Sequence, residues 1–294
     1  MTRFRSLIFL FSLPSFLSAQ LPNCDVWLFT YKYNQNNYHF TGGLNVSNTN
    51  GYDNQPSFSA NGSYMIWTAQ RDSNETDIFR YDITHHTTMR ITQTPFSEYS
   101  PTYMEGNKYI SAIVVEKDSV QRLWKYNKIS GQGKVVLPKF FGAGYHCWYD
   151  DHTVFLFQVT TPSTLVLADT RSGVTKNCAK NVGRCMQIYR SSKQKMLLYT
   201  EESDSAVWIK AMDGRGNKID DFAPVKLPDG VQDFAVDRNG NLLAGKGSKL
   251  YQWTIGSSTE WVNIADFAGN GIRNITRISL SPDNLHIAFV DNTN

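Results

Sequence analysis

Landmark residues, most of them aromatic, recur along this sequence at a nearly constant spacing. One series occupies the third position of short apolar segments such as DIF and RLWKYN, and from Phe79 onward its steps are 42 to 45 residues: Phe79, Trp124, Val166, Trp208 and Tyr251, with Trp27 as an N-terminal relative. A second series has steps of 41 to 46 residues: Phe58, Tyr103, Trp148, Tyr189, Phe234 and Leu280. A period of about 40–45 residues without long helical patterns is typical of four-stranded β-propeller blades.

The best-preserved copy of the repeat is QPSFSANGSYMIWTAQRDSNETDIFRYD. Each of its parts contains residue types that favour one part of a blade. Pro56 donates no backbone hydrogen bond and therefore suits the start of a strand. Asn61–Gly62 suits a tight hairpin, whose central residues need positive φ. Residues 63–69 form a second strand that is apolar on both alternating sets, which indicates that neighbouring blades cover both of its faces. Residues 77–83 form the third strand, and the segment MRITQ forms the outer one.

The ends of the chain complete the count of blades. Five full repeats are expected near 56–94, 101–139, 145–181, 186–228 and 232–264. The segment 274–291 supplies only the first two strands of a repeat, and 25–48 supplies only the last two. We therefore predict an all-β, six-bladed propeller over residues 21–294, with four-stranded antiparallel blades and one blade shared by the N- and C-terminal strands. Such closure removes exposed sheet edges.

The repeat resembles that of the TolB-like, WD40-like (PD40-type) propellers of bacteria. That repeat reads Pro-x-Phe-Ser-x-Asp-Gly, an apolar strand, and Asp-Ile-Tyr; VWIKAMDGRG and ISLSPDNLHIAFV are further relatives of it here. The resemblance implies an exported binding platform that receives protein partners at the mouth of its channel. Similar propellers cap serine peptidases of the prolyl oligopeptidase type, but this sequence contains no Gly-x-Ser-x-Gly motif.

The first twenty residues have the layout of a secretory signal peptide. Arg3 and Arg5 precede an apolar run over 7–17, and small residues precede Gln20. We therefore expect cleavage near Gln20 and a periplasmic or secreted protein, with no stable membrane insertion after cleavage. The net charge of +3, without a basic cluster, argues against a nucleic-acid partner.

Four cysteines are present, and none forms a Cys-x-x-Cys pair. A structural zinc site is therefore not expected. Cys178 and Cys185 are close enough in sequence to form a disulfide across a loop in an oxidising compartment. Two ordinary buried thiols are the alternative.

The connections between one blade's outer strand and the next blade's inner strand are expected to gather at one mouth of the channel. Propellers bind partners there because many loops converge on one concavity. Aromatic and arginine side chains are favoured anchors of interfaces. Charged residues near them are expected to add polar contacts. The candidate partner-binding residues are Phe96, Glu98, Tyr99, Phe140, Phe141, Tyr145, His146, Arg184, Asp233 and Arg273.

Two functions remain open on sequence alone. The first is a non-catalytic module that binds a protein, peptide or other ligand in the bacterial periplasm or cell envelope, without catalytic residues, metal or cofactor. The alternative is a metal-dependent lactonase or lyase with its active site in the central channel. That chemistry needs several carboxylates or histidines pointing into the channel, whereas the expected inner strands carry mostly Ser, Phe, Tyr and Gln.

Overall fold

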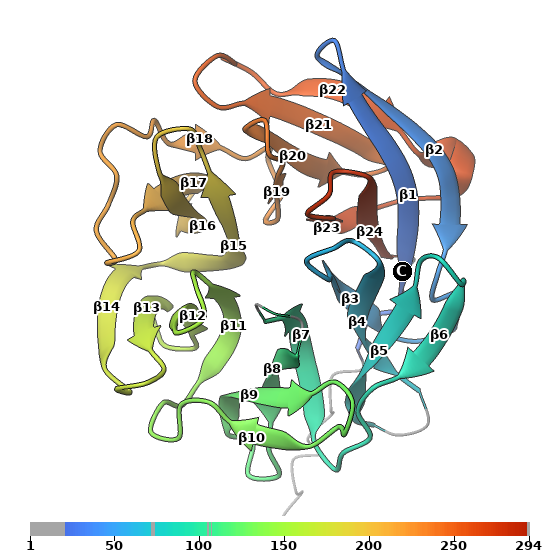
Figure 1. Cartoon of the computed structure of the whole chain (residues 1–294). Coiled ribbons are helices and arrows are strands. Elements are labelled where there is room, and N and C mark those ends of the chain that lie inside the picture. Colours follow the sequence, from blue (N-terminus) through green and yellow to red (C-terminus); the bar gives the residue numbers. More distant parts are fainter. Residues whose placement is uncertain (1–20, 72–73, 105, 107, 293–294) are drawn as a thin grey trace, which may run out of the picture.

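Six four-stranded antiparallel sheets surround a central channel in the computed structural model, which describes residues 21–71, 74–104, 106 and 108–292 (Figure 1). The predicted all-β, six-bladed propeller is therefore confirmed. The predicted signal peptide, residues 1–20, lies outside the described residues. Within them, no helix is long and apolar enough to cross a membrane.

Each of the first five blades is one continuous segment of chain. We number the blades in chain order. Blade 1 contains β3 (Asp53–Phe58), β4 (Tyr64–Gln70), β5 (Thr76–Asp82) and β6 (Thr87–Arg90). Blade 2 contains β7 (Ser97–Tyr103), β8 (Tyr109–Val115), β9 (Gln121–Asn127) and β10 (Gly133–Val135). Blade 3 contains β11 (Ala143–Trp148), β12 (Thr153–Gln158), β13 (Thr164–Asp169) and β14 (Thr175–Lys180).

The next two blades are less regular in their outer or inner strands. Blade 4 contains β15 (Val182–Arg190), β16 (Lys195–Ser203), β17 (Ala206–Met212) and a short outer strand, β18 (Val225–Lys226). Blade 5 contains a short inner strand, β19 (Ala235–Val236), followed by β20 (Asn241–Lys246), β21 (Lys249–Thr254) and β22 (Val262–Asp266). A short 3₁₀ segment, η2 (Ala268–Asn270), leads to the last blade.

Blade 6 joins the two ends of the chain. Its inner strands are β23 (Ile275–Leu280) and β24 (His286–Asn292), and its outer strands are β1 (Cys24–Asn34) and β2 (Asn37–Asn45). Strands β1 and β24 are antiparallel, and Trp27 pairs with Phe289. The predicted closure by strands from both ends is thus confirmed.

The hydrophobic core lies between blades. Six clusters of buried side chains each combine residues of two neighbouring blades. In β4, for example, Met65 and Trp67 pack against blade 6, whereas Ile66 packs against blade 2. This explains why the second strand of a repeat is apolar on both alternating sets. A β-strand points successive side chains to opposite faces, and each face meets another blade.

One landmark of the sequence pattern is displaced by two residues. In blade 5, Val236 rather than Phe234 occupies the end of the inner strand, because Val236 pairs with Leu242. The equivalent pairs in other blades are Trp148 with Val154 and Tyr189 with Met196. Phe234 is instead fully buried against blade 4.

Candidate functional site

The innermost strands β3, β7, β11, β15, β19 and β23 line the channel (Figure 1). Because the blades repeat one meander, these strands all begin at the same end of the channel, which we call the N-terminal mouth. Two cavities of about 430 Å³ and 410 Å³ lie there and along the channel. Arg184, Asp233 and Arg277 line both, so these three charged residues stand where the two cavities meet.

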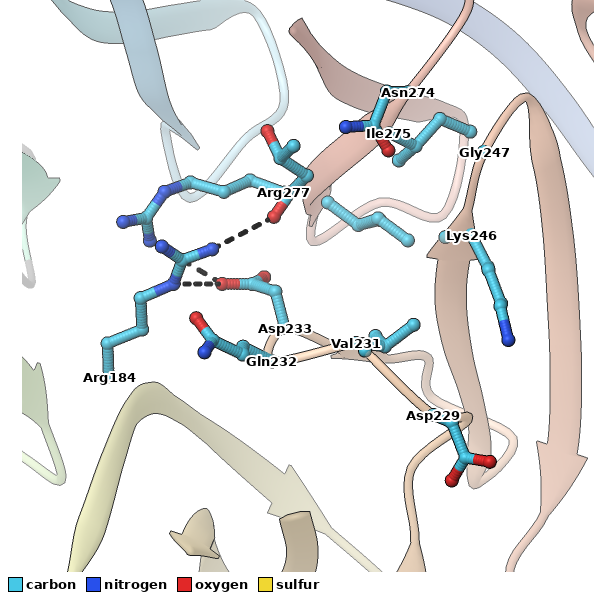
Figure 2. Close-up of a pocket in the computed structure, with 14 residues that line it drawn as sticks. Arg184, Asp229, Val231, Gln232, Asp233, Lys246, Gly247, Asn274, Ile275 and Arg277 are labelled. Atoms are coloured by element: carbon cyan, nitrogen blue, oxygen red, sulfur yellow. Dashed lines mark hydrogen bonds and ion pairs between the residues drawn. The ribbon is translucent and has the colours of Figure 1, made fainter. Parts of the chain in front are cut away.

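The three residues form one ionic cluster (Figure 2). Asp233 Oδ2 lies 3.5 Å from Arg277 Nη1 and 3.8 Å from Arg184 Nε. Arg184 Nη2 donates to the Thr276 carbonyl at 3.2 Å, and Arg277 Nη2 donates to the Tyr145 hydroxyl at 3.1 Å. The Arg277 guanidinium also lies over the Tyr145 ring. The cluster therefore connects blades 3, 4, 5 and 6 around the channel.

Irregularities in the pairing of the strands set the directions of these side chains. The ladder between β23 and β24 shifts register between Ile275 and Arg277. The ladder between β11 and β12 shifts just before Tyr145, and that between β15 and β16 shifts across the segment that holds Arg184. Bulges of this kind bend a strand and redirect side chains, and they are frequent beside functional sites.

The cluster carries more positive than negative charge in a partly dehydrated place. The side chains of Asp233, Arg277 and Arg184 are 9%, 12% and 29% exposed. Burial raises the pKa of Asp233, and the positive charges of Arg277 and Arg184 oppose that rise. Charge-assisted hydrogen bonds between nitrogen and oxygen are normally about 2.7–2.9 Å long, so Asp233 holds both guanidinium groups loosely.

His146 takes part in a buried hydrogen-bond chain beside the channel. Its Nε2 lies 2.7 Å from Ser111 Oγ, which also accepts a hydrogen bond from Trp148 Nε1 at 2.8 Å. Burial lowers the pKa of His146 to about 3, so the imidazole is neutral. Because Ser111 has no exposed surface, this pair supports the wall of the channel and presents no nucleophile to a ligand.

Three of the ten predicted site residues meet at the ionic cluster: Tyr145, Arg184 and Asp233. His146 lines the neighbouring channel cavity. The prediction that Glu98 makes polar contacts at the mouth is wrong, because its carboxyl group is buried between blades 1 and 2 and bonded to Thr92, Thr94 and Tyr126. The sequence placed Glu98 in the connection between two blades, whereas the structure places it in β7, where the neighbouring blade covers its side chain.

The remaining predicted residues pack elsewhere. Phe96 contacts Trp124, and Tyr99 contacts Tyr52 across a blade interface. Phe140 packs against the core between blades 2 and 3, while Phe141 is half exposed beside Arg122. Arg273 is exposed, and its backbone N–H donates to Asp291 Oδ1.

The possible disulfide between Cys178 and Cys185 is not formed in the structure, where all four cysteines are free thiols. Cys178 lies on the outer strand β14, and Cys185 lies on the inner strand β15. The Cys185 thiol instead donates to the Phe234 carbonyl at 3.2 Å. Within the described residues, no group of three His, Cys, Asp or Glu side chains is arranged to hold a metal ion.

Arg277 is the site residue that sequence reasoning missed, although the repeat contained a signal for it. Arg277 lies three residues before the landmark Leu280, as Tyr145 lies three residues before Trp148. The two landmarks pair with equivalent residues of the second strand, Ile287 and Val154. Counting back from each landmark would therefore have placed Arg277 opposite Tyr145.

No protein-family model and no curated protein matches the sequence. Solved structures do match the fold. A protein assigned as TolB from Agrobacterium tumefaciens has a TM-score of 0.66 and 10% identity, over 92% of this chain and 99% of its own. A gluconolactonase from Xanthomonas campestris has a TM-score of 0.62 and 11% identity, over 93% and 97%.

TolB from Acinetobacter baumannii matches over 63% of this chain and 46% of its own, with a TM-score of 0.48 and 15% identity, so this chain spans less than half of that relative. At such identities the comparisons show the fold alone. The match to the Agrobacterium tumefaciens protein confirms the predicted resemblance to TolB-like propellers at that level.

Proposed function

We propose that this chain is an exported, non-catalytic binding propeller that receives a protein or peptide partner at its N-terminal mouth in the periplasm or cell envelope. The observation that carries the proposal is the Arg184–Asp233–Arg277 cluster at the junction of two cavities. The side chains of this cluster provide positive charge and hydrogen-bond donors to which a partner can bind. The likeness in fold to a TolB protein and the composition of residues 1–20 support the same proposal.

A position-dependent crosslink tests this function. Gln232 is exposed and lines the 430 Å³ cavity, whereas Ile129 is 90% exposed on the turn between β9 and β10. We expect a photoreactive residue at Gln232 to form a discrete adduct in periplasmic extract, and unlabelled protein in excess to abolish it. The same photoreactive residue placed at position 129, in place of Ile129, serves as the control. Equal adducts from both positions, or none from Gln232, would contradict a binding mouth.

The enzyme alternative makes a different prediction for the same purified protein. A lactonase of the metal-dependent kind needs several metal ligands in the channel. The channel cavity contains Asp233, His146, Cys147 and Cys185, but in the described part of the chain no three such side chains are arranged around a common point. The Nε2 atom of His146 is already engaged by Ser111. We expect metal analysis to find no stoichiometric divalent ion; a bound metal together with lactone hydrolysis would replace the binding proposal with an enzymatic one.

A further inference from the structure

The two arginines at the N-terminal mouth keep hydrogen-bond donors that the protein does not use. A guanidinium group carries five N–H donors. In the described part of the chain, Arg184 donates from Nη2 to Thr276, and its buried Nε has no hydrogen-bond partner. Arg277 donates from Nη1 and Nη2, the former to Asp233 over 3.5 Å. Donors therefore remain for a ligand.

The charge of the cluster fits one additional negative charge. Figure 2 shows the guanidinium groups of Arg184 and Arg277 next to each other, both facing Asp233. Two cations and one anion leave an excess of one positive charge in a partly buried place, where an unpaired charge is costly. A ligand with a single negative charge would balance it. A dianion such as HPO₄²⁻ would exceed this balance by one negative charge, and Asp233 would repel it more strongly than a monoanion.

The surrounding cavity sets the size and character of the ligand. Its volume of about 430 Å³ falls within the range of small-ligand pockets, which starts near 300 Å³. Val231 and Ile275 supply apolar walls, and the amide groups of Gln232 and Asn274 supply polar ones (Figure 2). Such a space admits one or two amino-acid residues, with the charged group at the arginines.

We propose that Arg184 and Arg277 form a binding site for a peptide carboxylate, held by the unused guanidinium donors while the adjoining residue fills the cavity. A carboxylate matches the planar fork of a guanidinium group and accepts two hydrogen bonds from it. The carboxylate comes from either a chain terminus or an acidic side chain. This inference rests on the proposed function, because it identifies the chemistry of the partner that the mouth receives.

Short peptides distinguish the two sources. The probes are acetyl-Gly-Ala-Leu with a free C-terminal carboxylate, the same peptide as its amide, and acetyl-Gly-Glu-Leu-amide, with inorganic phosphate as a fourth probe. We expect at least one carboxylate peptide to bind in calorimetry, and the neutral amide to bind at least about tenfold more weakly. Whichever carboxylate peptide binds more tightly identifies the source.

Three variants of the full chain locate the binding. Arg184→Gln is expected to weaken carboxylate binding at least about tenfold, whereas the matched control Arg171→Gln, at an exposed arginine on the turn between β13 and β14, should leave it unchanged within about twofold. Asp233→Asn removes the competing carboxylate, so it should strengthen peptide binding and allow phosphate to bind. Thermal unfolding of each variant shows whether it is folded.

Equal binding of the amide and carboxylate peptides, tighter binding of phosphate than of either peptide by the native protein, or identical effects of Arg184→Gln and Arg171→Gln would overturn the carboxylate site. If these results occur while the Gln232 crosslink persists, the inference fails and the proposed function stands. If the Gln232 crosslink is also absent, both the inference and the proposed function are contradicted. An Arg184→Gln variant that loses stability but keeps its peptide affinity would assign the cluster a purely structural role.

Discussion

At the scale of single residues, Glu98 shows how a neighbouring blade changes the chemistry of a side chain. Burial raises its pKa to about 7 from an ordinary value of 4.5, although hydrogen bonds from Thr94, Tyr126 and Thr92 oppose the rise. Between these two values the folded protein holds a proton that the unfolded chain has lost. The stability that Glu98 contributes is therefore fully present below pH 4.5 and is lost as the pH rises through 7.

Replacing Glu98 with Gln should remove this dependence on pH. One unit of pKa shift corresponds to about 1.4 kcal/mol. The free energy of unfolding of Glu98→Gln, relative to the native protein, should thus increase by roughly 3 kcal/mol between pH 4.5 and pH 8. Urea unfolding at several pH values measures this difference, in which the contribution of His146 cancels because both proteins contain it. A difference that does not change with pH would show that Glu98 is ionised in the folded protein.

At the scale of elements, the hairpins β3–β4 and β23–β24 use the same turn chemistry. Ser59 Oγ donates to Asn61 Oδ1 and accepts from the backbone N–H of Tyr64. Ser281 Oγ makes equivalent contacts with Asp283 and His286. The two turns also approach each other across the interface of blades 6 and 1, since a methyl group at Gly62 would come within 2.1 Å of Asp283 Oδ2.

Gly62→Ala should therefore destabilise the protein more than an alanine at an equivalent but open turn. Gly62 has φ of +71°, and Gly173 has φ of +73° with no atom within 4 Å of an added methyl group. Gly173→Ala should cost about 1 kcal/mol from the positive φ alone, and Gly62→Ala about 1–3 kcal/mol more, because Asp283 must leave its turn. Equal losses in chemical unfolding would mean that the two turns do not contact each other in solution.

At the scale of the whole molecule, the ring depends on strands that are far apart in the sequence. Phe289 of β24 has no exposed surface and packs against Phe29 of β1, with ring centroids 5.6 Å apart. It also contacts Phe267, which follows blade 5, at 4.8 Å. This one side chain therefore connects both halves of blade 6 to the preceding blade.

Phe289→Ala should weaken the closure of the entire ring. Truncation of a buried phenylalanine costs about 3–5 kcal/mol, and here the loss falls on the joint between the two ends of the chain. The matched control is Phe141→Ala, because Phe141 is 50% exposed and its truncation should cost less than about 1 kcal/mol. We expect urea unfolding to show the large loss only for Phe289→Ala; similar losses for both variants would argue against closure through blade 6.

The fold could be predicted from the sequence because the patterns that indicate it lie within single repeats. The spacing of Phe79, Trp124 and Trp208 reports the length of a blade. The two-sided apolar character of residues 63–69 reports a strand between two other blades. The incomplete repeats at the ends indicated that β1 and β24 must pair, as the register of Trp27 with Phe289 confirms.

The tertiary structure alone decided which side chains share a site. Tyr145 and Arg277 are 132 residues apart in the sequence, yet they meet across the channel. The repeat gives the two residues equivalent strand positions, but their contact also depends on closure of the ring and on bulges that redirect individual side chains. The same reason explains Glu98, because Thr92 and Thr94, which follow the preceding blade in the chain, help to bury its carboxyl group. The order of the strands follows from the sequence of each repeat. The excess positive charge at the N-terminal mouth arises only when the six blades form a closed ring, because the charged residues come from different blades.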